Sequence, residues 1–199
     1  MECTARLRRI EPPLCDRCGA PTAWPVRRCA ECTGRRLAFA HARAALEYDK
    51  PLRTVVAGWK ERGLRGLARW AAETVAGTLP CPDADCLVFI PGDRERRLRR
   101  GHHAAERLAR ELGTAWDLPV EPLLVRSGGA ARQRGLSRAG RRRNVASAFR
   151  ATGSAPSRVA LIDDIYTTGA TANAAAAALR KGGARTVEVV TFARTIRIS

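Results

Sequence analysis

The sequence has no long hydrophobic run: none of its stretches approaches the roughly 18 unbroken apolar residues of a membrane-spanning helix. Its first residues, MECTARLRRIEPPLC, also lack the apolar run of a secretory signal peptide. We therefore expect a cytoplasmic protein without a membrane span. A length of 199 residues suits one medium domain plus a small module, and two large domains would not fit.

The sequence also lacks the pattern of a disulfide-stabilised protein. Its seven cysteines, at positions 3, 15, 18, 29, 32, 81 and 86, are an odd number in a chain without a secretion signal. Disulfide frameworks belong to oxidising compartments and pair their cysteines. We expect no such framework, and we interpret Cys3, Cys81 and Cys86 as ordinary thiols.

Lysine is scarce. Only Lys50, Lys60 and Lys181 are lysines among the 36 basic residues, so arginine supplies nearly all of the positive charge behind the +17 net charge. Such a charge attracts polyanions and favours nucleic acids, nucleotides or sugar phosphates as partners. A genome that favours arginine is the alternative explanation, because the preference runs through the whole chain.

Four of the cysteines form two close pairs, in the spacing C-x2-C-x10-C-x2-C. Each pair can make one knuckle, and four thiolates complete the tetrahedral shell of zinc without an open position for chemistry. Residues 1–36 show too little apolar periodicity to bury a core unaided, so the metal would stabilise the fold. This zinc ribbon's predicted structural Zn²⁺ ligands are Cys15, Cys18, Cys29 and Cys32.

Residues 37–199 have the pattern of an α/β domain. Strand-like runs are expected at 37–48, 86–90, 120–125, 159–162 and 187–193. Helices are expected at 52–61, 64–75, 104–112 and 171–183. Pro122 favours an edge position for its strand. The strand, helix, strand series from 159 to 193 predicts a parallel crossover. We therefore predict a parallel sheet flanked by helices, with an entry region at 37–80 and a core at 81–199.

The segment RVALIDDIYTTGATANAAAAALRKGG carries the sharpest functional pattern. Its apolar strand ends in Asp163 and Asp164, and a Thr/Gly loop then opens a helix that Thr171 is expected to cap. Backbone N–H groups at a helix N-terminus bind phosphate, and Gly169 allows close approach. Carboxylates beside such an anion site require a ligand that donates hydrogen bonds. A ribose 5-phosphate, with its diol, meets both requirements.

The same segment resembles the phosphoribosyl-pyrophosphate motif of type I phosphoribosyltransferases, in which an apolar strand, two acidic residues and two variable residues precede TTGAT. The resemblance implies that Asp163 and Asp164 contact the ribose hydroxyls and take part in catalysis. It assigns the 5-phosphate to Thr167, Thr168, Gly169, Ala170 and Thr171.

Over nearly its whole length the sequence resembles the ComF family of competence-associated proteins. Besides the ribbon and the motif, the matching features include the YDKPLR segment that starts at Tyr48 and RQRGLSRAGRRRNVASAF at 132–149. One departure follows Gly101, where His102, His103 and Ala104 replace the family's usual Phe-Asn-Gln. If the family's amides contact ligand, specificity changes; if they only cap the next helix, little changes. We interpret both histidines as surface residues.

The resemblance implies an enzyme that transfers the phosphoribosyl group from phosphoribosyl pyrophosphate to a nitrogen acceptor, with Mg²⁺ on the diphosphate. In the wider phosphoribosyltransferase fold, the loop after the first core strand meets pyrophosphate, and a mobile basic loop closes over the site. By position, these loops are 91–100 and about 132–143, and Arg100 and Arg132 are the expected contacts. No cluster of residues identifies the acceptor.

The competing hypothesis is a non-catalytic module in DNA uptake that binds single-stranded DNA or partner proteins, which the ComF resemblance implies and the charge permits. Proteins that bind single strands usually interleave aromatic with basic residues. The basic stretches 94–100 and 132–143 contain no Phe, Tyr or Trp. DNA contact there would be mainly electrostatic, and the ribbon also offers a surface to a protein partner.

Overall fold

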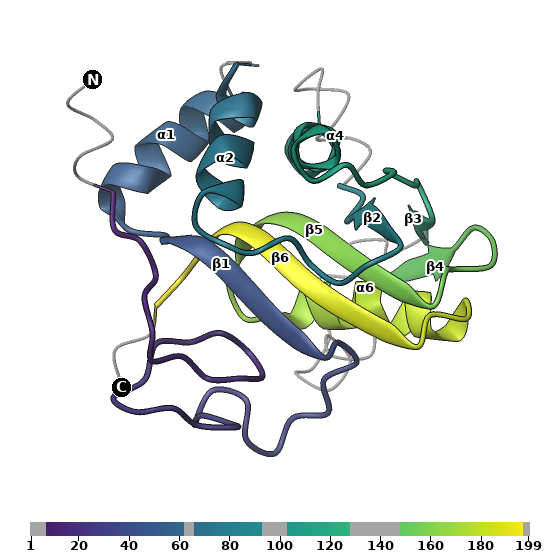
Figure 1. Cartoon of the computed structure of the whole chain (residues 1–199), viewed down its shortest axis with the longest axis horizontal. Helices are drawn as coiled ribbons and strands as arrows, with labels where there is room; N and C mark the ends of the chain where they lie inside the picture. Colours follow the sequence, from purple (N-terminus) through teal and green to yellow (C-terminus); the bar gives the residue numbers. More distant parts are fainter. Residues whose placement is uncertain (1–6, 62–65, 93–102, 128–147, 197–199) are drawn as a thin grey trace, which may run out of the picture.

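A four-stranded parallel sheet forms the centre of the molecule (Figure 1). The computed structural model describes residues 7–61, 66–92, 103–127 and 148–196. The strand order is β1-β6-β5-β2, and each neighbouring pair is parallel. These strands are His41–Glu47 (β1), Cys86–Phe89 (β2), Arg158–Tyr166 (β5) and Thr186–Arg194 (β6). The predicted α/β class, with a parallel sheet flanked by helices, is confirmed.

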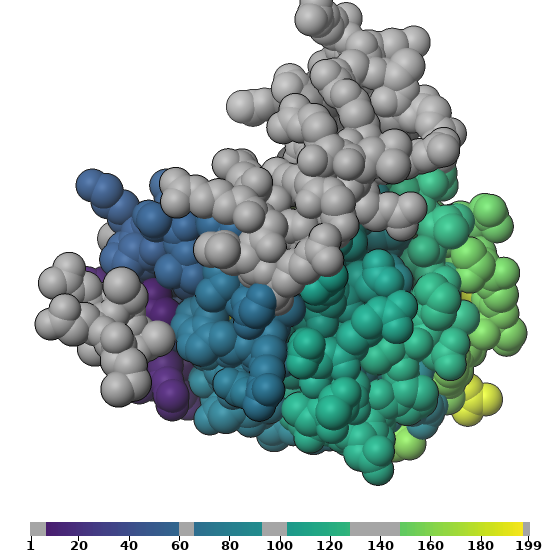
Figure 2. Space-filling view, turned by 90° about the horizontal axis from the view of Figure 1, so that it is seen from above, coloured from purple at the N-terminus to yellow at the C-terminus, as the bar shows by residue number. Residues whose placement is uncertain are grey.

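Helices cover both faces of this sheet. One face carries α1 (Lys50–Glu61), α2 (Leu67–Ala76) and α4 (Ala104–Trp116), and Figure 2 shows the molecule from that side. The opposite face carries α6 (Ala170–Lys181). No helix in the described part of the chain has the length and apolarity needed to cross a membrane. Strands covered on both faces read as near-continuous apolar runs, which explains the VALI segment of β5.

The predicted crossover from residue 159 to 193 is confirmed by the parallel pairing of β5 with β6. Its helix, α6, consists largely of alanine, the best helix former, and its last turn carries Arg180 and Lys181, which complement the helix dipole. Gly183 follows with φ +115, a left-handed conformation. The alanines let α6 pack closely on the sheet, where Ala175 and Ala176 are fully buried.

A second, two-stranded sheet differs from the sequence prediction. Leu124–Arg126 (β3) pairs antiparallel with Phe149–Ala151 (β4), so the strand expected at 120–125 begins later than predicted. Val120 makes only an isolated bridge to Leu87, and Pro122 separates that bridge from β3. The strand β4 was not predicted because three residues are too few to show the alternation of apolar and polar residues that indicates a strand.

The cysteine-rich segment lies beneath β1 and β6, on the side of the sheet that α6 covers (Figure 1). Cys15, Cys18 and Cys32 belong to the same buried cluster as Tyr166 and Leu179. The segment therefore shares a core with the sheet. The division into a ribbon at 1–36, an entry region at 37–80 and a core at 81–199 stays a prediction.

Candidate functional site

The end of β5 and the loop after it bring part of the predicted ligand site together. Asp163 and Asp164 are both half-buried, and an Asp163 carboxylate oxygen accepts a hydrogen bond from the Asp164 N–H at 2.9 Å. A hollow of ≈ 20 Å³ lies beside them, which is room for about one water molecule. Its lining consists of Asp163, Ile165, Tyr166, Thr167, Gly169, Thr171, Ala172 and Thr191. Asp164, Thr168 and Ala170 adjoin these residues in sequence but do not line the hollow.

The predicted helix cap at Thr171 is wrong. Gly169 is the N-cap, with φ 71 and ψ 5, and α6 already begins at Ala170. The Ala170 N–H donates to the Thr168 hydroxyl at 3.3 Å. The left-handed glycine starts the helix before Thr171, which therefore lies in the first turn. Thr167, Thr168 and Thr171 are all exposed, so their hydroxyls can meet a ligand.

Gly169 packs directly on the side chain of Tyr166. A Cβ atom at position 169 would overlap the Tyr166 hydroxyl and lie 2.5 Å from Cζ. Its positive φ also disfavours any L side chain. Both the conformation and the close approach therefore require glycine here.

Tyr166 was not anticipated because it occupies one of the motif's two variable positions. Its side chain is only 4% exposed, and its ring meets Phe39 edge to face with centroids 6.4 Å apart. Burial raises the pKa of the phenol to about 12, so it is neutral at physiological pH. The hydroxyl makes no hydrogen bond among the described residues.

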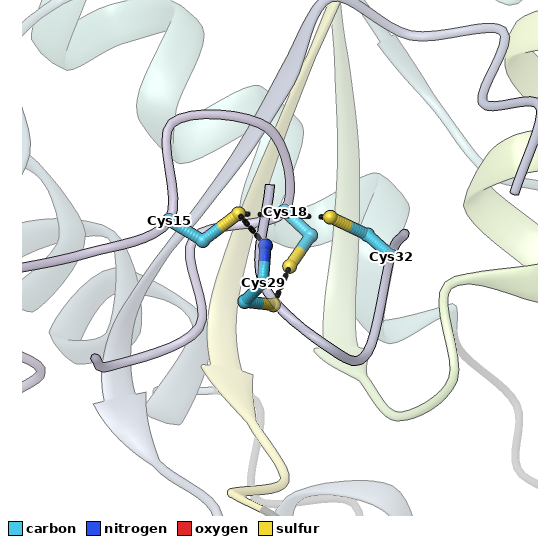
Figure 3. Close-up of side chains that lie close together, drawn as sticks. All are labelled: Cys15, Cys18, Cys29 and Cys32. Carbon is cyan, nitrogen blue, oxygen red and sulfur yellow. Dashed lines mark hydrogen bonds between the residues drawn. The ribbon is translucent and has the colours of Figure 1, made fainter. Parts of the chain in front are cut away.

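The four predicted zinc ligands converge on one point (Figure 3). Their sulfur atoms all lie within 4.8 Å of one another. Cys15 Sγ lies 3.6 Å from Cys32 Sγ, and Cys18 Sγ lies 3.5 Å from Cys29 Sγ. Zn–S bonds of 2.3 Å in a tetrahedron place sulfurs about 3.8 Å apart, so the arrangement can bind a zinc ion. Among the residues described, these four make up the one such cluster of candidate metal ligands.

The thiols of this cluster differ in acidity. Burial acts to raise the pKa of Cys15, but backbone hydrogen bonds from Cys18, Cys29 and Arg17 lower it to about 7. Burial raises the pKa of Cys18 and of Cys32, because it disfavours the charged thiolate. The neighbouring cysteines raise both pKa values further, because a second thiolate beside the first would be repelled. A divalent cation would remove this repulsion and hold all four sulfurs as thiolates.

Curated proteins similar to this chain carry names that refer to competence and DNA. Competence protein F of Haemophilus influenzae is 28% identical over 194 residues, covering 92% of this chain and 85% of that protein. DNA utilization protein YhgH of Salmonella typhi is 31% identical over 206 residues, covering 96% and 88%. YhgH of Escherichia coli strain K12 is 28% identical over 208 residues. The chain belongs to the ComF family. The assignment predicted from the ribbon and the motif is thus confirmed.

No family model matches the sequence. Among solved structures, glutamine phosphoribosylpyrophosphate amidotransferase from B. subtilis, complexed with ADP and GMP, aligns with a TM-score of 0.42 and 22% identity. The alignment covers 64% of this chain and 25% of that one.

The departure from the ComF pattern after Gly101 falls at the start of α4. His103 is the N-cap of this helix, and its Nδ1 accepts a hydrogen bond from the Glu106 N–H at 3.1 Å. The imidazole therefore caps α4, as asparagine side chains commonly do at helix N-termini. His102 lies outside the described residues, as do Arg100 and Arg132, the arginines expected at the diphosphate.

A second concave surface lies where the ribbon meets β1. This basic groove has a volume of ≈ 640 Å³. Its lining consists of Asp16, Arg17, Arg27, Arg28, Ala40, His41 and Arg43. Among the described residues, none of its four arginines forms an ion pair with a carboxylate. Sequence analysis missed this groove because the arginines come from segments that only the fold brings together.

Proposed function

We propose that this ComF protein binds phosphoribosyl pyrophosphate, or another ribose 5-phosphate ligand, at the end of β5 and transfers the phosphoribosyl group to a nitrogen acceptor. The observation that supports this most is the placement of Asp163, Thr167, Gly169 and Thr171 around one hollow. The hollow lies at the carboxyl end of a parallel strand. Ligands of open α/β sheets bind outside the carboxyl ends of the strands.

The loop from Thr167 to Thr171 would bind the 5-phosphate. Gly169 makes no side-chain cap, and the first N–H groups of an α-helix have no partners within the helix. The Ala170 N–H already donates to the Thr168 hydroxyl, so the N–H groups of Thr171 and Ala172 and the exposed threonine hydroxyls are the suitable donors. The helix dipole favours an anion there. Because the hollow admits only about one water, the phosphate would lie at its mouth.

The carboxylates of Asp163 and Asp164 would accept hydrogen bonds from the ribose 2- and 3-hydroxyls. In the transfer, the bond from ribose C1 to the pyrophosphate oxygen breaks and a C1–N bond forms. Pyrophosphate leaves with the electron pair, and the acceptor nitrogen loses its proton. The two carboxylates would stabilise the positive charge that develops on the sugar.

Two metal ions and two further residues complete the proposal. Mg²⁺, which prefers oxygen ligands, would bind with the diphosphate and neutralise its charge. Zn²⁺ would be held by Cys15, Cys18, Cys29 and Cys32 as a structural ion. Arg100 and Arg132 stay predicted contacts of the diphosphate.

Calorimetry with phosphoribosyl pyrophosphate and Mg²⁺ at moderate salt tests the ligand site. We expect the wild type to bind and Asp163→Asn and Asp164→Asn each to weaken binding by about 10- to 150-fold, the value of a charge-assisted hydrogen bond. Asp117→Asn is the matched control, since Asp117 is exposed after α4 in a left-handed conformation that asparagine tolerates. A folded, zinc-loaded wild type that does not bind would disprove the proposed site.

Turnover needs a separate measurement. Nitrogenous bases are added singly to protein, Mg²⁺ and phosphoribosyl pyrophosphate, and pyrophosphate release is followed. We expect at least one base to give release that Asp164→Asn abolishes. Binding without release for every base would leave a binding protein without transferase activity.

A second candidate function, contact with single-stranded DNA, is favoured by the basic groove and by Trp24. Trp24 is 68% exposed and belongs to the ribbon, three residues before Arg27. Three residues span at most about 11 Å, so an aromatic face occurs close to an arginine that has no carboxylate partner among the described residues. Base stacking beside phosphate contacts is the usual arrangement in single-strand binders. The names of the relatives, which mention competence and DNA utilization, agree with such a ligand.

Binding of a labelled oligothymidylate over a range of salt concentrations tests this candidate. Trp24→Ala should weaken binding by about 1–3 kcal/mol if one base stacks on the indole. Arg27→Ala should lower the slope of log K against log salt by about 0.7, the value for one phosphate on a single strand. Arg110→Ala is the control, because Arg110 pairs with Glu106 on the far face of the sheet. Unchanged affinity in both ribbon variants would contradict the assignment and favour a protein partner for this surface.

A further inference from the structure

Arg194, the last residue of β6, contacts both halves of the metal site. Its side chain is only 2% exposed. One terminal nitrogen donates to the carbonyl oxygen of Cys18, in the first knuckle. The other donates to Glu31 Oε2 at 3.0 Å, and Glu31 lies between the two cysteines of the second knuckle. A single guanidinium thus connects both knuckles to the central sheet.

The same guanidinium also lies against the residue that precedes the proposed phosphate loop. Its central carbon is 5.0 Å from the centroid of the Tyr166 ring. Tyr166 and Arg194 are register partners on β5 and β6, and the Thr195 N–H donates to the Tyr166 carbonyl at 2.9 Å. Since Tyr166 in turn packs on Gly169, a continuous series of contacts runs from the cysteines to the start of α6.

Stability alone does not account for an arginine at this position. A buried ion costs desolvation energy, and a hydrophobic residue of similar volume often stabilises a fold as well or better. Arg194 also leaves its Nε buried without a hydrogen-bond partner among the described residues. Four thiolates around one Zn²⁺ form a net negative centre, which favours a guanidinium beside it. Charge and geometry therefore match a closed metal site.

We infer that Arg194 is a positioning residue that couples the metal site to the ribose-phosphate loop; this inference rests on the proposed function. When both knuckles close around the metal, Cys18 and Glu31 hold Arg194 against the ring of Tyr166. Tyr166 then supports Gly169 in the left-handed conformation from which α6 starts. When the knuckles open, Arg194 loses both acceptors and the loop loses this support.

The test measures the affinity for ribose 5-phosphate by calorimetry in zinc-loaded and zinc-stripped protein. Stripping should weaken binding by the wild type by about 5- to 150-fold, the usual range of coupling between two sites. Arg194→Met should weaken binding by the loaded protein to a similar degree, and stripping should then change little. Coupling is reciprocal, so ribose 5-phosphate should raise zinc affinity against a competing chelator by the same factor in the wild type and not in the variant.

Arg43→Met is the matched control. Arg43 also donates to a knuckle carbonyl, that of Asp16 at 3.0 Å, but it lies on β1 and it is Arg194 whose guanidinium packs on the Tyr166 ring. Stripping should weaken its ribose 5-phosphate binding as much as it does in the wild type. Arg194→Lys gives a second test if Arg194→Met does not fold. Lysine keeps the positive charge but lacks the planar guanidinium that donates to Cys18 and Glu31 together.

The outcomes separate the inference from the function on which it rests. A zinc-loaded wild type that does not bind ribose 5-phosphate would overturn both. Binding that is lost on stripping by the same factor in the wild type and in the Arg194 variants would overturn the coupling alone. Loss of the zinc dependence in the Arg194 variants, with the dependence kept in Arg43→Met, would support it.

Discussion

Gly169 is the residue whose replacement should damage the proposed site most directly. Gly169→Ala should destabilise the protein by more than about 1 kcal/mol, because a left-handed alanine costs about 1–2 kcal/mol and its Cβ overlaps Tyr166. Urea unfolding measures the loss. Gly153→Ala is the control, since no atom lies within 4 Å of a Cβ there. Equal stability of the two variants would contradict the close approach of Tyr166 to the loop.

Tyr166 should make stability depend on pH in the alkaline range. Burial raises its pKa from the ordinary 10.0 to about 12, so the neutral phenol is favoured in the folded state. The stability that the folded state gains from this preference is fully present below pH 10 and is lost as the pH rises toward 12. The unfolding free energy of the wild type should therefore fall relative to that of Tyr166→Phe as the pH rises from 9 to 12. A pH-independent difference would show that the phenol is not buried in this way.

Among single residues, the sequence allowed us to predict those site residues that are neighbours in the chain. Asp163, Thr167, Gly169 and Thr171 could be assigned from one segment, and the structure brings all four to one hollow. Arg194 could not be assigned, because its partner Glu31 lies 163 residues away in sequence. Which arginine of 33 is buried depends on tertiary packing that no local pattern encodes.

Among the elements, α4 allows a direct test of the histidine that departs from the ComF pattern. His103→Ala should destabilise the protein by about 1 kcal/mol, since the Glu106 N–H would lose its acceptor. His103→Asn should keep most of the stability, because asparagine is a good N-cap. Thermal unfolding of both variants measures this. A stability loss as large in the Asn variant would show that the ring's packing on Phe89, 5.9 Å between centroids, matters more than the cap.

Elements with long apolar or periodic sequences were predicted well. The strand, helix, strand series that ends in β6 follows from two buried apolar runs around an alanine helix. The short strands β3 and β4 have three residues each, which is below the length at which alternation is visible. The start of α6 was placed wrongly because a left-handed glycine, and not a hydroxyl, ends the loop.

For the whole molecule, removal of zinc should lower the stability of the entire fold and not only that of the ribbon. Cys15, Cys18 and Cys32 share a buried cluster with residues of the sheet and α6. A ligand whose free concentration is 1,000 times its dissociation constant raises the free energy of unfolding by about 4 kcal/mol. For a chain of this size, that corresponds to a rise in Tm of roughly 8–16 °C. Calorimetry of loaded and chelated protein measures this shift.

Cys81→Ser is the control for that experiment, because Cys81 is exposed and lies outside the cluster. The same Tm with and without chelator would show that the four thiols do not hold a stabilising metal. The convergence of Cys15, Cys18, Cys29 and Cys32 was predictable from their spacing. The shared core was not, since the ribbon's own sequence gives no sign of the surface on which it packs.

The central claim is that the loop after β5 binds a ribose 5-phosphate. Amide NMR spectra recorded during a titration with ribose 5-phosphate test it most directly, because they report where the ligand binds. We expect saturable shifts at Asp163, Asp164 and residues 167–171 in the wild type and smaller shifts in Asp163→Asn. Shifts confined to the basic groove, or none in the folded, zinc-loaded protein, would contradict it.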